Sequence, residues 1–257
     1  MMEKFNLKDM KHIKLSKLPD TERIIRKKGK RVRPIYSILS SLNDPINIIA
    51  EIKKSSPSAG TIGSGVSPAE RASLYSRGGA AAVSVLTEKN FFNGSMNDME
   101  TAGSHLALPL LCKDFIYYEE QIEAAYLCGA DMILLIAKAL SNDEMRGLYN
   151  FARSRGITPL IEVHSSSELD RVLILNPEIL MVNMRNLETL NIGYSTGINT
   201  LNNIPPGIKR VSASGIESQD EVKKIFHETG TDTFLVGTAL MKGDNPRGFI
   251  RELKDVR

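Results

Sequence analysis

Residues 132–138 read Met-Ile-Leu-Leu-Ile-Ala-Lys, the longest uninterrupted apolar run of the chain, closed by Lys138. The run is far shorter than the ~20 residues that a transmembrane helix needs. A short apolar run that follows a glycine and ends at a charge is typical of a parallel strand covered on both faces. We therefore expect neighbouring strands at its edges and helices on its faces.

Seven further runs of this kind lie on either side, and they recur every 20 to 35 residues, which is the spacing of a strand followed by a helix. All eight runs cover residues 48–52, 82–86, 109–112, 132–137, 158–163, 179–182, 208–211 and 234–236. Eight strand–helix units predict an α/β fold of the closed (β/α)8 type, a TIM barrel. A doubly wound open sheet is the alternative, because alternation alone does not establish closure.

Helix start and stop signals separate the runs. Ser67-Pro68-Ala69-Glu70 places a hydroxyl at the N-cap, proline at the first helical position and a glutamate three residues after the cap. Ser141 with Glu144 and Ser218 with Glu221 repeat this capping-box spacing. Glycines suited to left-handed C-caps stand before the next strands at positions 78, 79, 129, 156 and 230.

The N-terminal part of the chain differs from the rest in charge. We expect one domain over residues 1–257, with a helical extension over 1–46, including an apolar-faced segment at 34–42, and the barrel over 47–257. Residues 1–33 carry 12 Lys/Arg and 4 Asp/Glu, against 21 and 26 in the remainder. The basic segment 26–33 could bind a polyanion, but no aromatic residue interleaves it, so we do not expect nucleic acid as a partner. A solvated arm or a helix near an anionic substrate is the plainer interpretation.

The composition is that of an ordinary folded protein, with 42% hydrophobic and 25% charged residues in 257 positions, which excludes disordered and disulfide-scaffold classes. Cys112 and Cys128 lie in apolar or helical stretches and are expected to be reduced core residues. The first residues carry charges in place of the apolar segment of a secretion signal, so we expect a cytoplasmic protein that is a monomer or a weak homo-oligomer.

The residues that end the apolar runs are polar, and barrel enzymes place their active sites at these carboxyl ends. Glu51 and Lys53 lie two residues apart, so strand alternation puts both side chains on one face, which closure of the barrel makes the inner one. A surface ion pair worth ~0–1 kcal/mol would explain that pair equally well. Lys113 and Glu162 close two other runs, and several charges at a buried rim favour a functional site.

Glycines follow the last two strands, where barrel proteins commonly bind phosphate through backbone amides. These are Gly215, after Ser214, and Gly237, before Thr238. His164 follows Glu162 by two residues and is expected to hydrogen-bond behind the site without catalysing. We expect no metal, because no group of candidate ligands has the required spacing. No cofactor is expected, and no Gly-x-Gly-x-x-Gly motif follows the first strand.

Taken together, residues 48–253 resemble the indole-3-glycerol-phosphate synthase family. The most specific piece is Glu-Ile-Lys-Lys-Ser-Ser-Pro-Ser-Ala-Gly at 51–60. Supporting pieces in the same order lie at 85–88 with 91–95, 111–115, 162–164, 183–187 and 214–216.

This resemblance implies a lyase of tryptophan biosynthesis. Its substrate, 1-(2-carboxyphenylamino)-1-deoxyribulose 5-phosphate, closes to indole-3-glycerol phosphate with loss of carbon dioxide and water. Lys113 would be the general acid at the carbonyl oxygen and Glu162 the acid/base of the dehydration, with Lys53 assisting and Glu51 orienting the lysines. Substrate would be held by Ser56, Pro57, Phe92, Asn183, Arg185, Leu187 and Ser214, and its phosphate by Ser56, Gly215, Gly237 and Thr238.

The chain departs from the family pattern at Ala213, where the family usually has a glutamate two residues before the glycine. Met184 replaces a residue that is usually polar. The missing carboxylate leaves open a barrel with weak turnover or a shifted substrate, or a phosphate-binding protein without activity. A sugar-phosphate isomerase such as phosphoribosyl anthranilate isomerase is less favoured, because it would want a Cys or Asp base near the first strand.

Overall fold

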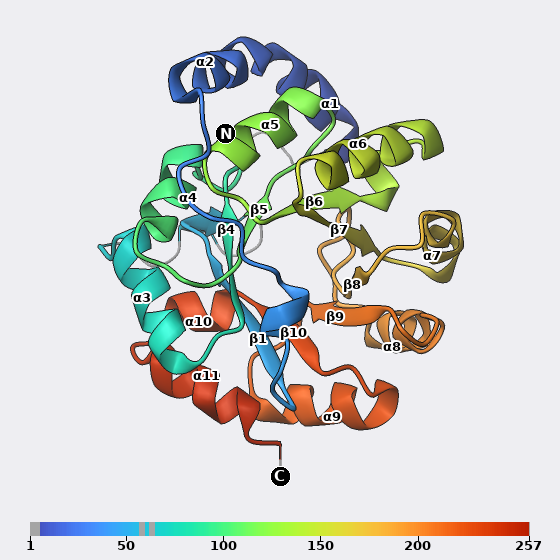
Figure 1. Ribbon diagram of the computed structural model, residues 1–257. Coiled ribbons are helices and arrows are strands. Elements are labelled where there is room, and N and C mark those ends of the chain that lie inside the picture. Colours follow the sequence, from blue (N-terminus) through green and yellow to red (C-terminus); the bar gives the residue numbers. More distant parts are fainter. Residues whose placement is uncertain (1–5, 57–59, 62–64, 257) are drawn as a thin grey trace.

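A ring of parallel strands forms the centre of the molecule. The computed structural model describes residues 6–56, 60–61 and 65–256. Within them, eight strands close into a barrel in the order β1-β10-β9-β8-β7-β6-β5-β4, so consecutive strands of the ring are neighbours (Figure 1). Closure excludes the open-sheet alternative. A separate antiparallel pair, β2 (Ser55–Ser56) with β3 (Gly60–Thr61), follows β1.

Each apolar run predicted from the sequence forms one strand of the barrel, with bounds that differ by two residues at most. The strands are β1 (Asn47–Ile52), β4 (Ala82–Leu86), β5 (Leu110–Lys113), β6 (Met132–Ile136), β7 (Thr158–Val163), β8 (Ile179–Asn183), β9 (Lys209–Ala213) and β10 (Thr233–Val236). These predictions are confirmed because every strand is buried on both faces, as its continuous hydrophobicity requires.

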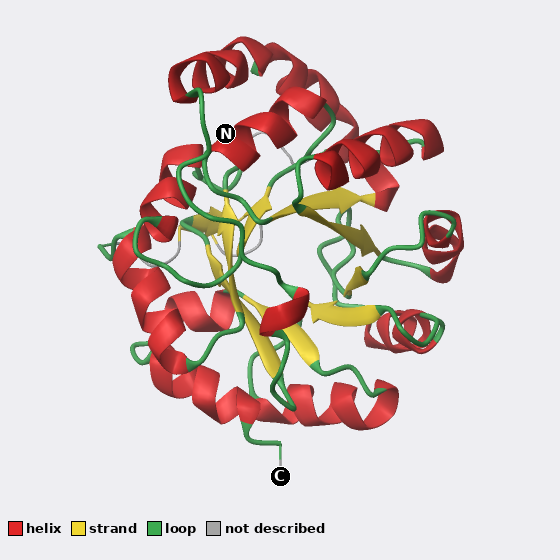
Figure 2. Cartoon of the chain, in the orientation of Figure 1, coloured by secondary structure: helices red, strands yellow, loops and turns green. Residues whose placement is uncertain are grey.

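Helices surround the strands on the outside of the ring (Figure 2). The helices of the barrel are α3 (Pro68–Gly78), α4 (Met96–Gly103), α5 (Glu119–Leu127), α6 (Asn142–Ser154), α7 (Ser166–Leu173), α8 (Tyr194–Asn202), α9 (Gln219–Thr229), α10 (Thr238–Lys242) and α11 (Pro246–Lys254), with a 3-10 turn η2 (Ala137–Ala139). The predicted caps are present: the Ser67 hydroxyl accepts a hydrogen bond from the Glu70 amide, and capping boxes begin α6 and α9. No helix among the described residues is long and apolar enough to cross a membrane.

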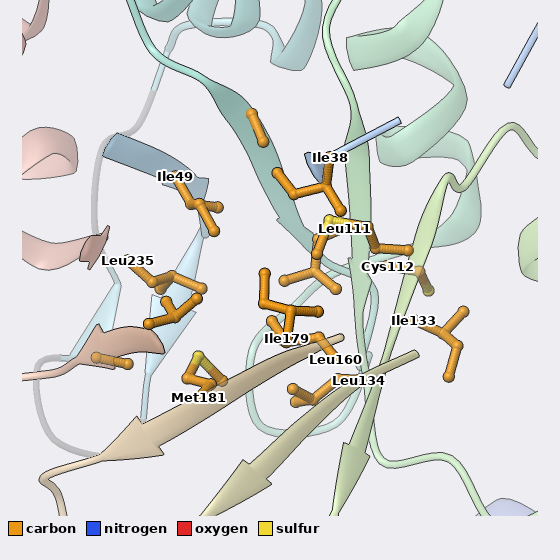
Figure 3. Close-up of a cluster of buried hydrophobic side chains, with 14 of the residues drawn as sticks. Ile38, Ile49, Leu111, Cys112, Ile133, Leu134, Leu160, Ile179, Met181 and Leu235 are labelled. Atoms are coloured by element: carbon orange, nitrogen blue, oxygen red, sulfur yellow. The ribbon is translucent and has the colours of Figure 1, made fainter. Parts of the chain in front are cut away.

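The inner face of the barrel changes from apolar to charged along the strand direction. Register partners share a face, and the chain of partners from Ile49 through Leu235 and Ala213 to Asn183 therefore marks the inner one. Figure 3 shows buried hydrophobic side chains of the core, among them Ile49, Leu111, Leu160 and Met181 of this face. Two residues further along, on the same face, apolar positions give way to polar ones: Ile49 to Glu51, Leu111 to Lys113, Leu160 to Glu162 and Met181 to Asn183. The buried apolar layers, at about 1.5–3 kcal/mol per large side chain, hold this polar layer in place.

The N-terminal extension is helical only in its first part. It contains α1 (Leu7–Ser16), α2 (Leu18–Lys28) and, in the expected apolar-faced segment, no more than a 3-10 turn η1 (Leu39–Ser41). Helix α2 packs against α5 (Figure 1). Lys14 of α1 is buried and forms an ion pair with Asp114, directly after Lys113. The extension is therefore attached to the end of the barrel that carries the charged layer.

Two arginines of the basic segment are structural cations. Arg31 Nη2 lies 2.5 Å from Asp131 Oδ1, and Arg33 Nη1 lies 2.7 Å from Asp131 Oδ2. Asp131 is fully buried before β6 and also accepts hydrogen bonds from the amides of Tyr36 and Leu110. The guanidinium groups donate to main-chain carbonyls of 106, 108, 126, 129 and 130 as well. This clamp fastens the extension to the amino-terminal end of the barrel.

Replacing Asp131 with alanine should destabilise the protein by about 3–5 kcal/mol, because two buried guanidinium groups lose their shared counter-ion. Urea unfolding followed by circular dichroism measures the change. Glu22→Gln is the matched control, since Glu22 forms an exposed pair with Arg26 and its loss should cost about 0–1 kcal/mol. A loss below about 1 kcal/mol for Asp131→Ala would show that the clamp contributes little.

Candidate active site

A cavity opens at the carboxyl ends of the strands, where barrel enzymes carry their chemistry. Its walls come from the ends of β1, β5, β8, β9 and β10 and from the loops that follow β4 and β8. The predicted site residues that line it are Glu51, Lys53, Phe92, Lys113, Asn183, Arg185, Leu187, Ser214, Gly215, Gly237 and Thr238. The structure thus brings together side chains that lie up to 187 positions apart in the sequence, from Glu51 to Thr238.

Three other predicted residues, Glu162, Ser56 and Pro57, are not among the described lining residues. Glu162 belongs to the inner face of β7 but is 1% exposed and is not among the residues that line the cavity. The backbone of Ser56 belongs to β2, but its side chain and the whole of Pro57 lie outside the described residues. Their predicted contacts with substrate remain predictions.

The carboxylate of Glu51 is shared by two ammonium groups. Lys53 Nζ lies 3.1 Å from Glu51 Oε1, and Lys113 Nζ lies 3.3 Å from Glu51 Oε2. Burial alone would raise the pKa of Glu51, but the charges of Lys113 and Lys53 outweigh it and lower the pKa to about 2. Burial alone would lower the pKa of Lys113, but Glu51 and Glu162 raise it above its ordinary value. Lys113 is therefore held as a cation, and both lysine side chains line the cavity beside the same carboxylate.

Gly237 is required by this cluster. A Cβ atom at position 237 would lie 2.3 Å from Glu51 Oε1 and 3.1 Å from Lys53 Nζ, closer than packing permits. Without a side chain, the backbone of Gly237 and Thr238 approaches the ion pair directly, at the start of α10. Main-chain N–H groups and a lysine ammonium thereby meet at one side of the cavity.

Asn183 connects three parts of the site. Its Nδ2 donates to Glu162 Oε1 at 3.2 Å, while its Oδ1 accepts from the Ser214 hydroxyl at 2.7 Å and from the Arg185 amide at 3.1 Å. Through these contacts, the end of β8 positions the carboxylate of Glu162, the loop at Ser214 and the backbone of Arg185.

The loop after β9 has a backbone suited to binding an anion. Ser214 and Gly215 both have positive φ, at 71° and 74°. For a serine this conformation costs about 1–3 kcal/mol and persists only where contacts enforce it. The Asn183 contact holds Ser214, and the Tyr194 hydroxyl donates to the carbonyl of Gly215. This loop follows the seventh strand of the barrel, where barrel proteins commonly bind phosphate.

Phe92 is presented by a loop that its neighbours fix. The buried carboxylate of Glu88 accepts hydrogen bonds from the amides of Asn90 at 2.9 Å and Phe91 at 2.7 Å. The ring of Phe92 then lies 6.4 Å from that of Phe115, measured between centroids, and both rings line the cavity. An aromatic substrate ring fits this apolar side.

Arg185 faces the cavity from the loop after β8. Its Nη1 donates to the carbonyl of Leu190 at 2.7 Å, which leaves the rest of the guanidinium for a ligand. Lys53, Lys113 and Arg185 line the cavity together with two carboxylates, Glu51 and Glu217. The cavity lining therefore carries one more positive than negative charge and suits an anion.

His164 lies between two carboxylates, those of Glu162 and Glu168. Its Nε2 is 3.3 Å from Glu162 Oε1, and its Nδ1 is 3.5 Å from Glu168 Oε2. Burial alone would lower the pKa of His164, but the nearby carboxylates of Glu168 and Glu162 outweigh it, and the pKa is raised.

Several cavity residues were not identified from the sequence. Phe115, Leu190 and Glu217 line the cavity from loops. Phe115 and Glu217 each stand two residues after a predicted site residue, Lys113 and Gly215, which is the signal that could have found them. Leu190 carries no such signal, since its place depends on the loop after β8 folding back.

Comparison with known proteins gives a family. A family model described as indole-3-glycerol phosphate synthase matches residues 3–253. A relative of that name in Bacillus mycoides is 36% identical over 247 residues, which cover 96% of this chain and 95% of that protein. Another in a Nocardioides species is 41% identical over 210 residues, covering 82% and 80% of the two chains.

Solved structures agree on the fold. The chain is similar to 3-hexulose-6-phosphate synthase from Salmonella typhimurium, with a TM-score of 0.64 and 13% identity over 82% of this chain and 98% of that one. It is also similar to N-acetylmannosamine-6-phosphate 2-epimerase from Clostridium perfringens, with a TM-score of 0.61 and 13% identity over 82% and 93%. At these identities the likeness supports the barrel alone.

Replacing Glu51 with glutamine should lower stability in a pH-dependent way. The pKa of Glu51 falls from 4.5 to about 2 on folding, so its stabilisation is complete above pH 4.5 and is lost as the pH falls toward 2. We expect the free energy of unfolding of wild type to exceed that of Glu51→Gln by about 3 kcal/mol at pH 7. This difference should shrink as the pH falls below 4.5. Urea unfolding from pH 2 to 7 measures it.

Asp143→Asn is the control, because this carboxylate is 97% exposed and its replacement should change stability little at any pH. A Glu51→Gln difference that stays constant across the pH range would contradict the ion-pair account.

Proposed function

This chain belongs to the indole-3-glycerol phosphate synthase family, and from that premise we propose how it acts. It closes 1-(2-carboxyphenylamino)-1-deoxyribulose 5-phosphate to indole-3-glycerol phosphate, the decarboxylating lyase step of tryptophan biosynthesis. The observation that carries this proposal is the Lys53–Glu51–Lys113 cluster, which presents two cations to an anion-binding cavity. The residue roles below are proposals built on that geometry.

Lys113 is the general acid of the ring closure. The aryl carbon that bears the carboxylate attacks the substrate's carbonyl carbon, and the carbonyl oxygen takes a proton from the ammonium of Lys113. A raised pKa keeps this ammonium charged until the oxyanion develops. A positioned general acid typically contributes about 10²–10⁴ in rate. Carbon dioxide then leaves, and the electrons of the broken bond restore the aromatic ring without a cofactor.

Glu162 and Lys53 handle the protons of the dehydration. One proton goes to the leaving hydroxyl, which departs as water, and one leaves the adjacent carbon that carries the nitrogen. Glu162 is oriented toward this work by the amide of Asn183. Lys53 is held by Glu51, which positions both lysines.

Binding is divided around the cavity. The phosphate is held by backbone groups of Gly215, Gly237 and Thr238, with Lys53 as counter-ion and Ser56 in support. Asn183, Arg185 and Ser214 hold the reacting end. Phe92, Leu187 and Pro57 contact the aromatic part. For Ser56 and Pro57 the proposal rests on the family resemblance.

Partner and compartment belong to the same proposal. The substrate is a small anionic sugar phosphate, and we propose a cytoplasmic protein, a monomer or a weak homo-oligomer, that does not bind nucleic acid. Cys112 and Cys128 are buried and unbridged, which fits a reducing compartment. The burial of Arg31 and Arg33 against Asp131 supports a structural role for those two basic residues.

Ala213 favours a second candidate, a barrel that binds anions without turnover. Its side chain lines the cavity and lies in register with Asn183 and Leu235. At this position β9 supplies no carboxylate. The ion pair of Glu51 with Lys113, close to Glu162, supports the enzyme, because a protein that only binds phosphate has no use for a general acid buried beside carboxylates.

Replacing Lys113 with methionine should lower kcat by about 10²–10⁴, because the developing oxyanion loses its proton donor. The appearance of indole fluorescence after substrate is added measures the rate. Lys209→Met is the control and should keep the full rate, since Lys209 pairs with Asp232 at the opposite end of the barrel. A wild-type protein that stays silent at micromolar enzyme would end the proposal.

Replacing Ala213 with glutamate tests the second candidate. We expect wild type to turn over measurably and Ala213→Glu to raise kcat by about tenfold, within what one added acid or base supplies. Ala213→Gln, of the same size but uncharged, should give no rise. A wild-type rate near zero that the glutamate restores by several orders of magnitude would instead identify a decayed enzyme.

A further inference from the structure

The proposed reaction requires a source of protons. With the aryl carboxyl group ionised, two protons enter the substrate, at the carbonyl oxygen and at the leaving hydroxyl, and one leaves from carbon. Each turnover therefore consumes one proton net, which water outside the site must supply. This inference rests on the proposed function, because the proton demand follows from the loss of carbon dioxide from a carboxylate.

A path for this proton leads away from the cavity through three side chains. Glu162 Oε1 accepts a hydrogen bond from Asn183, which lines the cavity, and the same oxygen lies 3.3 Å from His164 Nε2. Glu168, in the first turn of α7, follows His164. Side-chain exposure rises along this line from 2% for Glu162 to 11% for His164 and 15% for Glu168.

The imidazole ring of His164 is not fully hydrogen-bonded within the structure. Both ring nitrogens of His164 are buried and lie at ion-pair distance from carboxylates without making a well-directed hydrogen bond, and Glu162 Oε2 is also without one. Buried polar atoms are nearly always satisfied, and exceptions at a site often mark a functional role. Glu168 also accepts a hydrogen bond from the His164 amide at 2.8 Å, which fixes the spacing of the two residues.

The charges around His164 suit a group that gains and loses a proton. Glu162 and Glu168 face it on two sides, and Lys138, itself paired with Glu188, acts on it from the loop after β6. The two carboxylates raise the pKa of His164 against its burial, so it carries a proton more readily than a free histidine.

We propose that His164 and Glu168 relay protons from water to Glu162 during turnover. The N–H bond at Nε2 breaks as an O–H bond forms on Glu162, leaving a neutral imidazole protonated at Nδ1. The ring then turns about its Cβ–Cγ bond, and the bare nitrogen takes a proton from a water molecule held at the carboxylate of Glu168, whose hydroxide passes to the solvent. Water is the only reactant that the relay consumes. His164 is thus a positioning and proton-supplying residue that acts through Glu162.

Single-turnover rates with enzyme in excess test the relay, read from indole fluorescence between pH 6 and 9. We expect His164→Gln to lower the rate about tenfold or more at pH 8, and less at pH 6 where protons are abundant, with substrate Kd unchanged. Added imidazole should restore much of the rate. Glu168→Gln should give a smaller loss in the same direction. His105→Gln, at an exposed position, should match wild type throughout.

A wild-type rate retained by His164→Gln would overturn the relay, and so would a loss that is equal at every pH and not restored by imidazole, since a purely structural role predicts that pattern. Circular dichroism and thermal unfolding confirm that each variant is folded. Should His164→Gln fail to fold, Glu168→Gln and the solvent deuterium isotope effect on wild type carry the test. Failure of the proposed function is separate, because wild type would then give no indole signal at all.

Discussion

The sharing of one buried carboxylate by two ammonium groups is the interaction on which the site depends. Without Glu51, Lys53 and Lys113 would face each other across a cavity of low dielectric, where like charges repel and the charged form is disfavoured. With it, the pKa of Lys113 is raised, and the proposed division of roles, with Lys113 as the acid and Lys53 at the phosphate, rests on this shared carboxylate. The same carboxylate dictates glycine at position 237, because no Cβ fits beside it.

Much of the candidate site could be predicted from the alternation of side chains along the strands. A period of two puts Glu51 and Lys53 on one face of their strand. Parallel strands that end at the same edge bring Lys113 and Asn183 to the same end of the barrel. The strand runs and capping boxes are local signals and were confirmed. The Asp131 clamp was not foreseen, because it joins residues about 100 positions apart that no period connects. For the same reason, the sequence could not show that Glu162 is fully buried or that the Tyr194 hydroxyl donates a hydrogen bond to the carbonyl of Gly215.

Asn183 explains why binding and proton transfer belong to one mechanical unit. Its amide nitrogen holds Glu162 while its oxygen holds Ser214 and the backbone of Arg185. Any shift of the loop after β9 is therefore transmitted to the carboxylate of Glu162, and the strained backbone at Ser214 is stabilised by the same strand end that holds this carboxylate. Since β8 is buried along its whole length, this hub sits on a rigid element.

Ala213 changes the balance of this unit. The lining residues carry three cations against two carboxylates, and a substrate with a carboxylate and a phosphate is attracted more strongly than it would be with a third acid on β9. The consequence is that fewer groups can accept or return protons during dehydration. In the proposed mechanism that duty falls on Glu162, which is buried and lies 3.3 Å from His164 Nε2. The absence of a carboxylate at Ala213 on β9 therefore increases the importance of Glu162 on β7 and of its neighbours His164 and Glu168.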